Sequence, residues 1–97
     1  EDGAIVTGGV EGELRQAIAN LEALLAAEGA SLADVVKTTV FLRHMSDYAP
    51  MNDTYVACFG DHRPARSAVG VAELPLGALV EIEAWARVPS TGAGTAR

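Results

Sequence analysis

Residues 79–88 restrict the possible folds of this chain more than any other segment. Their side chains alternate between apolar and polar, which is typical of a strand with one buried face. One face comprises Val80, Ile82, Ala84, Ala86 and Val88, and the other comprises Glu81, Glu83, Trp85 and Arg87. Such a strand needs neighbouring strands to pair with and a second layer to cover its apolar face.

Two segments have the spacing of amphipathic helices that can supply this layer. In residues 10–28, apolar side chains recur every three or four positions, and Gly29 follows as a residue that often ends helices. A second helix is predicted from an N-cap at Ser46 or Asp47 to about Phe59. Because each helix has one apolar face, both can pack against the same sheet.

Two further strands are predicted between and after the helices. Residues 35–42 are rich in β-branched side chains, and their alternation places Val36 on the same face as Thr38. Residues 65–71 predict another strand, and the turn residues of 72–78 connect it to the last strand. We therefore expect the last two strands to form a hairpin.

The order of the elements predicts an α+β fold, with a mixed sheet that carries two helices on one face. A short extended segment at residues 4–7 precedes the first helix, and a capping-box sequence at residues 31–34 predicts one helical turn. The chain of 97 residues can bury one core, so residues 1–89 form a single expected domain and residues 90–97 a flexible tail. A small core with only 5% aromatic residues also favours self-association.

The charge of the chain argues against some partners. Seven Lys and Arg against thirteen Asp and Glu give a net charge of −6, whereas nucleic-acid binding needs clustered cations. Only Arg63 and Arg66 are close together, which leaves room for a local site for one small anion. No apolar run approaches the roughly 20 residues that span a bilayer, so we expect neither a nucleic-acid nor a membrane partner. A single cysteine, Cys58, fits a reducing compartment and predicts a cytoplasmic location.

Arg66 is the first candidate for a functional role. It lies within a predicted strand and is flanked by the small residues Ala65 and Ser67. A guanidinium with space in front of it is suited to bind a carboxylate through two parallel hydrogen bonds. The alternative is an arginine whose head reaches water or pairs with a structural carboxylate.

Three polar side chains in predicted strands and helices are further candidates. Glu81 and Glu83 share a strand face at a spacing of roughly 7 Å, which suits either acid–base chemistry or a solvent-facing surface. Trp85 on that face favours a subunit interface or a cleft. Asn52 lies in the apolar stripe of the second helix, where its amide either enters a ligand pocket or is satisfied by backbone groups.

The remaining reactive side chains carry weaker signals. His62 lies in a loop and is expected to be solvated, and Cys58 has no nearby His or second Cys in the sequence, so it is interpreted as an ordinary helix side chain. The sequence contains no phosphate-binding loop, no dinucleotide motif and no His or Cys set with metal spacing. We therefore expect no metal and no dinucleotide in the site.

Four segments carry a family resemblance. They read D-V-V-K-T-T-V-F-L at 34–42, M-N-D-T-Y at 51–55, R-P-A-R-S-A-V at 63–69 and L-P-L-G-A-L-V-E-I-E-A at 74–84. Together they resemble the Rid family, the YjgF-type reactive intermediate deaminases. The resemblance covers about residues 3–88, and the P-A-R-S and E-I-E-A segments at their mutual spacing are specific in combination.

The resemblance implies a fold and a chemistry. The fold is a chorismate-mutase-like α+β domain, and the assembly is a homotrimer with clefts between subunits. Typical members hydrolyse 2-imino acids and their enamine tautomers to 2-oxo acids and ammonia without a cofactor. By position, Arg66 matches the arginine that holds the substrate carboxylate, and Glu81 the glutamate that serves water or the leaving ammonia. Asn52 and Ala68 match positions that line the cleft, although many members have Cys at the latter.

One departure from the family keeps other functions open. Members begin with a hairpin that contributes a Tyr and a Ser to the site, and this sequence lacks both segments. A non-catalytic trimeric module that binds small carboxylates or acts as a chaperone is therefore the main alternative. Endoribonuclease activity is less expected, because the net charge is −6 and no basic aromatic surface is evident.

Overall fold

The computed structural model describes residues 8–88. The extended segment expected at residues 4–7 and the tail expected at residues 90–97 lie outside the described residues. The expected end of the domain at residue 89 lies outside them as well.

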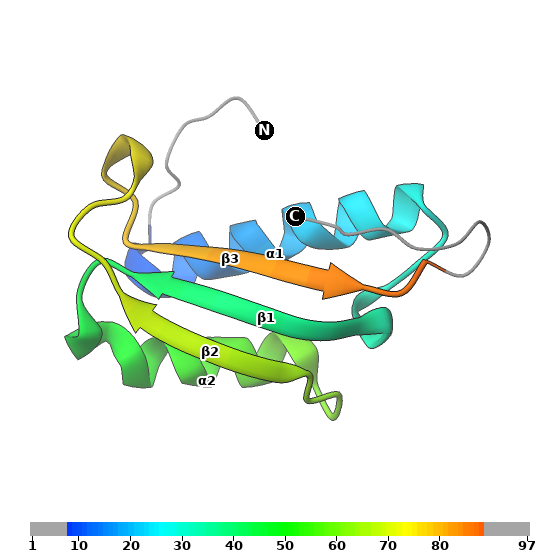
Figure 1. The fold of residues 1–97 in the computed structure, drawn as a ribbon. Coiled ribbons are helices and arrows are strands. Elements are labelled where there is room, and N and C mark those ends of the chain that lie inside the picture. Colours follow the sequence, from blue (N-terminus) through cyan, green and yellow to red (C-terminus); the bar gives the residue numbers. More distant parts are fainter. Residues whose placement is uncertain (1–7, 89–97) are drawn as a thin grey trace.

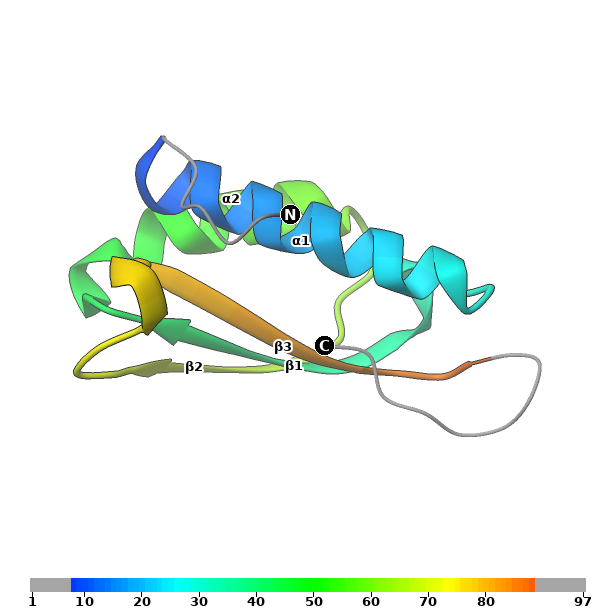
Figure 2. The same cartoon turned by 90° about the horizontal axis from the view of Figure 1, so that it is seen from above.

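The described chain folds into one sheet and a layer of helices on one of its faces (Figures 1 and 2). The helices are α1 (Gly9–Ala27) and α2 (Tyr48–Phe59), and the strands are β1 (Val35–Leu42), β2 (Ala65–Gly70) and β3 (Val80–Ala86). Single 3-10 turns occupy Leu32–Asp34, Met45–Asp47 and Pro75–Gly77. The predicted α+β fold is therefore confirmed, including the turn capped by Ser31.

The sheet has the strand order β2-β1-β3, so the predicted hairpin between the last two strands is wrong. β1 pairs with β2 in parallel and with β3 in antiparallel orientation. The connection from β2 to β3 passes the end of β1, where the Val71 N–H donates to the Leu42 carbonyl (2.8 Å). On the other side of β1, the Arg43 N–H donates to the Leu79 carbonyl (3.0 Å). β1 pairs with one strand at each of its two edges. The loop after β2 therefore crosses the end of β1, so that β3 pairs with the far edge of β1 and not with β2.

The core lies between the sheet and the two helices. The apolar stripe of α1 is buried as predicted and comprises Val10, Leu14, Ile18, Leu21 and Leu25. Gly29 has φ 76° and ends α1 in a Schellman motif, in which the Ala30 N–H donates to the Leu25 carbonyl (2.8 Å). The Glu13 carboxylate accepts a hydrogen bond from the Leu79 N–H (2.7 Å), which fixes α1 at the start of β3.

A bulge at the beginning of β1 changes the faces of its first residues. The pairing with β3 shifts register between Val35 and Lys37. As a result Val35 is fully buried, whereas Val36 is 50% exposed, and the predicted placement of Val36 beside Thr38 is wrong. An extra residue in one strand reverses the alternation locally, which a period of two cannot anticipate.

The start of α2 agrees with one of the two predicted N-caps, Asp47, but lacks the hydrogen bond of a capping side chain. Ser46 lies inside the 3-10 turn Met45–Asp47, and Asp47 occupies the N-cap position without a side-chain hydrogen bond to the helix. The two helical segments are therefore continuous, and the turn satisfies part of the helix start in place of a capping side chain.

The face of the sheet opposite the helices is uncovered by any other part of residues 8–88 (Figure 2). Trp85 on β3 is 50% exposed and Val69 on β2 is 41% exposed. Among the described residues, no helix has the length and apolar character needed to cross a membrane.

Candidate active site around Arg66

Arg66 lies on β2 with its side chain on the helix-covered face of the sheet, beneath α2. Its Nη1 donates to Asn52 Oδ1 (2.7 Å), and its Nη2 donates to the Tyr48 hydroxyl (2.7 Å). The structure thus brings together Arg66 and Asn52, two of the predicted site residues. An amide and a phenol hold the guanidinium in place of a structural carboxylate, and Arg66 is half-buried, so part of its head stays accessible.

Aromatic rings complete the surroundings of the guanidinium. The Arg66 Cζ lies 4.8 Å from the Tyr55 ring centroid and 5.6 Å from that of Tyr48. Such contacts favour a cation over the ring face. Tyr55 in turn stacks on Phe59, with ring centroids 4.5 Å apart. The guanidinium is therefore oriented by two hydrogen bonds and two rings.

The residues around Arg66 come from one face of α2. Tyr48, Asn52 and Tyr55 are spaced i, i+4 and i+7, so a regular helix presents all three in one direction. The sequence revealed this stripe, but sequence reasoning did not assign Tyr48 and Tyr55 to the arginine. The available signal was that Tyr48, Asn52 and Tyr55 each carry a polar group on the apolar face of the helix, where such a group needs a partner.

A buried hydrogen bond anchors this cluster to the sheet. The Tyr55 and Thr38 hydroxyls are 2.7 Å apart, and both residues are almost completely buried. Burial raises the pKa of Tyr55, while the Thr38 hydrogen bond and the charges of Arg66 and Arg63 act in the opposite direction. Tyr55 is therefore a neutral phenol at physiological pH, as an unperturbed tyrosine also is.

Replacing Tyr55 with phenylalanine should lower the free energy of unfolding by about 1–2 kcal/mol, because the Thr38 hydroxyl is left buried without this partner. Urea denaturation followed by circular dichroism measures the change. The double variant Tyr55→Phe/Thr38→Val removes both polar groups, so it should regain most of the loss. Equal stability of Tyr55→Phe and the parent would show that the bond contributes nothing.

A hollow of about 340 Å³ adjoins the guanidinium. It is lined by Asn52, Tyr55, Val56, Arg63, Pro64 and Arg66. A guanidinium has five N–H donors, and two of those of Arg66 are engaged by Asn52 and Tyr48. The remaining three are sufficient for a bidentate contact with one carboxylate.

The other predicted site residues divide between the two faces of the sheet. Ala68 follows Arg66 by two positions, so it shares the helix-covered face and is half-buried there. Glu81 is exposed on the opposite face, where it pairs in register with Phe41 of β1. β1 also separates the strands that carry Arg66 and Glu81. Arg66, Asn52 and Ala68 therefore cluster, and Glu81 does not join them within one chain.

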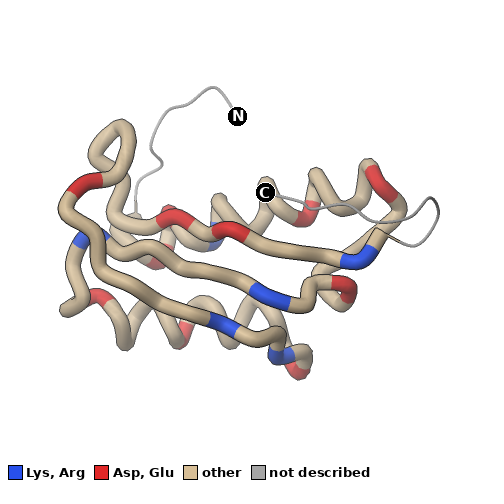
Figure 3. Tube along the Cα trace, viewed as in Figure 1, with Lys and Arg blue, Asp and Glu red and all other residues tan. Residues whose placement is uncertain are grey.

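The charged positions differ between the strands of the sheet. Figure 3 shows acidic positions along β3 and basic positions on β1 and β2. Glu83 and Trp85 lie on the same uncovered face as Glu81. Coverage of this face by another subunit stays a prediction.

Two weaker candidates have structural explanations. The predicted solvation of His62 is wrong, because His62 is half-buried and its Nε2 donates to the Val35 carbonyl (2.7 Å). The pairing of β1 with β2 begins only at Lys37 and Ala65, so the imidazole binds the part of β1 that precedes the start of β2. Cys58 is a half-buried residue of α2 with Arg15 Nη1 3.9 Å from its Sγ, consistent with its interpretation as a helix side chain.

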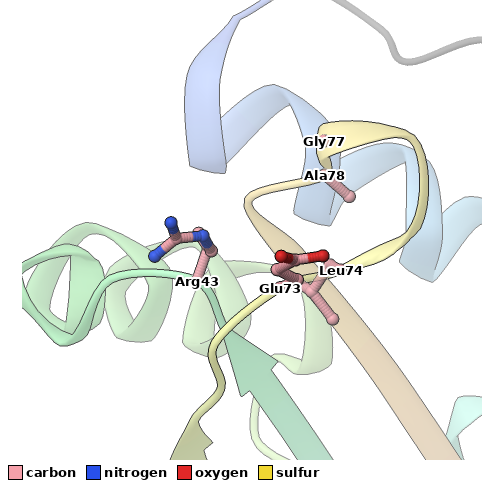
Figure 4. Close-up of a pocket in the computed structure, with 5 residues that line it drawn as sticks. All are labelled: Arg43, Glu73, Leu74, Gly77 and Ala78. Atoms are coloured by element: carbon pink, nitrogen blue, oxygen red, sulfur yellow. The ribbon is translucent and has the colours of Figure 1, made fainter.

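A second hollow of about 310 Å³ lies near the 3-10 turn before β3 (Figure 4). It is lined by Arg43, Glu73, Leu74, Gly77 and Ala78. One guanidinium and one carboxylate line this hollow, so its charge is balanced, in contrast to the hollow beside Arg66. Within residues 8–88 no group of three or more His, Cys, Asp or Glu side chains is arranged to hold a metal ion.

Comparison with known proteins identifies the family. The family model described as endoribonuclease L-PSP matches residues 1–88. The chain belongs to the endoribonuclease L-PSP family. This L-PSP domain is similar in structure to a Thermotoga maritima protein described as a candidate endoribonuclease, with a TM-score of 0.81 and 49% identity over 87% of this chain and 66% of that one. The YjgF protein of Escherichia coli gives a TM-score of 0.77 at 44% identity, over 81% of this chain and 65% of that one.

Curated relatives of the L-PSP domain have two kinds of name. A RutC family protein of Pyrococcus horikoshii is 49% identical over 87% of this chain and 67% of its own length. A Rattus norvegicus protein named 2-iminobutanoate/2-iminopropanoate deaminase is 45% identical over 95% of this chain and 68% of its own length. The chain thus spans about two thirds of the length of these relatives. These comparisons confirm the predicted family resemblance.

Proposed function

We propose that this protein hydrolyses reactive 2-imino acids to 2-oxo acids and ammonia. The observation that carries the proposal is the Arg66 guanidinium, which is oriented by Asn52 and Tyr48 and retains three N–H donors beside a hollow. Relatives at 44–47% identity are named 2-iminobutanoate/2-iminopropanoate deaminase, and their substrates are carboxylates of the size that such a hollow accepts.

In this mechanism Arg66 binds the substrate carboxylate and fixes the adjacent C=N group in space. Glu81 accepts a proton from water as the water oxygen bonds to the imine carbon, and the C=N electron pair moves to nitrogen, which takes up a proton from solvent. In the resulting amino alcohol, Glu81 returns its proton to the amino group and the hydroxyl proton passes to solvent. The C–N bond then breaks, ammonia leaves, and the C=O group of the 2-oxo acid forms. A positioned acid–base group contributes roughly 10²–10⁴ in rate to such steps. No step requires a metal or a redox change.

The mechanism needs two copies of the chain. Arg66 and Glu81 lie on opposite faces of one sheet, so a site that uses both takes them from different subunits. The family resemblance favours a homotrimer in which the uncovered sheet face is buried between subunits. The exposure of Trp85 and Val69 on that face supports such an assembly.

Assembly gives the first test of this proposal. Sedimentation equilibrium should give three times the chain mass of 10.0 kDa, and the Trp85 emission should be blue-shifted, because the indole leaves water at the interface. Substituting Trp85 with glutamate should weaken the trimer, whereas the matched change Leu24→Glu on the exposed side of α1 should not. A stable monomer with fully solvated Trp85 would contradict the shared site.

The hydroxyl of Tyr48 should affect substrate binding more than turnover. Tyr48→Phe keeps the ring but removes one of the two hydrogen bonds that orient Arg66. We expect KM for the imine to rise about three- to tenfold with little change in kcat, since a charge-assisted bond contributes roughly 1 kcal/mol or more. Steady-state kinetics separates the two constants, and an unchanged KM would contradict this role.

The activity itself can be measured with an imine formed in situ. An amino-acid oxidase converts 2-aminobutanoate to 2-iminobutanoate, and semicarbazide traps the imine that remains as an absorbing semicarbazone. Addition of this protein should reduce semicarbazone formation and accelerate ammonia release, and a metal chelator should not alter the effect. Semicarbazone formation at the spontaneous rate, with the assembled protein present, would contradict the proposal.

A binding module is the second candidate function. The separation of Arg66 from Glu81 within one chain favours it, because carboxylate binding requires only the cluster around Arg66. The same hollow would then hold a small carboxylate without hydrolysis. Endoribonuclease activity has the support of the family description, but a net charge of −6 disfavours an RNA surface. We also expect a cytoplasmic location, on the basis of the single cysteine.

A further inference from the structure

A second guanidinium lines the hollow beside Arg66. Arg63 belongs to the loop between α2 and β2 and faces the same space as Asn52 and Tyr55. In a chain of net charge −6, Arg63 and Arg66 are the basic residues nearest to one another along the sequence, and Figure 3 shows basic positions at the start of β2. Among residues 8–88, no Asp or Glu side chain lines this hollow.

The two guanidinium groups act on the same buried neighbour. The positive charges of both Arg66 and Arg63 lower the pKa of Tyr55, against the upward effect of burial. This agrees with the lining of the hollow, in which Arg63 and Arg66 lie beside Tyr55. An anion in the hollow would be attracted by two cations at once.

Arg63 uses only part of its hydrogen-bonding capacity in contacts with the described residues. Its Nη1 donates to the His62 carbonyl (3.2 Å), which uses one of the five N–H groups of a guanidinium. Arg63 is exposed, and Pro64 follows it at the entrance to β2, where the fixed φ of proline limits the local backbone. Arg63 is therefore free to contact a ligand that Arg66 already holds.

We propose that Arg63 binds the second carboxylate of a dicarboxylic substrate. This inference rests on the proposed function, in which Arg66 holds the carboxylate next to the imine. The preferred substrates would then be 2-imino diacids, and the preferred products 2-oxo diacids, over the monocarboxylic compounds named for the relatives. A hollow of about 340 Å³ is of the size that accepts a small ligand of this kind.

The experiment compares stable 2-oxo acids as ligands by isothermal titration calorimetry. 2-Oxoglutarate and 2-oxopentanoate share a five-carbon chain and differ only in a terminal carboxylate or methyl, and oxaloacetate and 2-oxobutanoate form the matching four-carbon pair. The diacid of at least one pair should bind about tenfold more tightly, which corresponds to about 1.4 kcal/mol. This preference should decrease as salt is added, because Arg63 is exposed.

Variants test whether Arg63 causes the preference for the diacid. Arg63→Ala should remove the difference within the pair and lower the affinity for the monoacid far less than that for the diacid, whereas Arg63→Lys should keep part of the difference. Arg43→Ala removes a cation from the other hollow and should change neither affinity. This control separates a local contact from the general effect of one charge.

Several results would overturn the inference. Equal affinities within both pairs, or an equal loss of preference in Arg43→Ala and Arg63→Ala, would exclude Arg63 as a second carboxylate site. Displacement of 2-oxoglutarate by inorganic phosphate at equal concentration would indicate a general anion site instead. These results leave the proposed function intact, because it requires only monocarboxylate binding at Arg66. If the protein binds none of the four acids, both proposals are wrong.

Discussion

Replacing Arg66 with alanine should reduce kcat/KM for 2-iminobutanoate at least about 100-fold, because the bidentate hydrogen bonds to the substrate carboxylate are lost. The binding of 2-oxobutanoate should become undetectable by calorimetry. The fold should persist, since the guanidinium is only half-buried and the core residues around it are unchanged. Circular dichroism and the thermal unfolding midpoint check this point.

Two further variants test whether the effect of Arg66→Ala is specific to the guanidinium at this position. Arg66→Lys keeps the charge but not the planar fork, so it should recover only a minor part of the affinity. Arg43→Ala deletes an exposed cation in the other hollow and should keep the activity of the parent. If Arg66→Ala binds 2-oxobutanoate as tightly as the parent, the assignment of the carboxylate site is wrong.

Replacing Glu81 with glutamine should lower kcat by roughly 10²–10⁴, the contribution of a positioned acid–base group, with little change in KM. The amide keeps the size of the side chain but cannot accept the proton from water. Affinity for 2-oxo acids should be retained, because Arg66 is unaltered. Steady-state assays with the semicarbazide trap measure the rate of imine hydrolysis.

Glu83 provides the control for this variant. It lies two positions after Glu81 on the same strand face, so Glu83→Gln makes the same chemical change nearby. We expect Glu83→Gln to retain the activity of the parent. If the parent hydrolyses the imine and Glu81→Gln does so equally fast, then Glu81 is not the acid–base group. If neither hydrolyses it but both bind 2-oxo acids, the binding module is the correct description.

Most of the secondary structure could be predicted from local sequence patterns. The apolar spacing of residues 10–28 predicted α1, because a helix needs one continuous apolar face to pack. The alternation in residues 79–88 predicted β3 and its buried face, although the strand ends at Ala86. These features depend on neighbours in the sequence, so the sequence alone is sufficient to reveal them.

The wrong predictions concern features that depend on contacts between segments far apart in the sequence. The turn residues of 72–78 suggested a hairpin, but hydrogen bonds at the end of β1 direct the chain to its far edge. The bulge after Val35 likewise depends on the pairing with β3 and has no signal in the alternation. The predicted solvation of the loop residue His62 was wrong because its acceptor, the Val35 carbonyl, is far away in the sequence.

The candidate site could be predicted only in part for the same reason. The residue types indicated that Arg66 binds an anion and that Asn52 is unusual in an apolar stripe, and the structure joins them by a hydrogen bond. The roles of Tyr48 and Tyr55 require knowledge of which helix covers β2. The sequence did not indicate that Glu81 and Arg66 lie on opposite faces of the sheet. The alternation of side chains shows only which residues of the same strand share a face.

The measurement that tests the shared site most directly is complementation between two inactive variants. Arg66→Ala and Glu81→Gln chains are refolded together in equal amounts, and imine hydrolysis is compared with that of each variant alone. If each site takes Arg66 from one subunit and Glu81 from another, about a quarter of the sites in a randomly mixed, head-to-tail assembly combine both native residues. We therefore expect about a quarter of the parent activity in the mixture. Activity no greater than the average of the two separate variants, in an assembly verified as mixed by mass spectrometry, would contradict it.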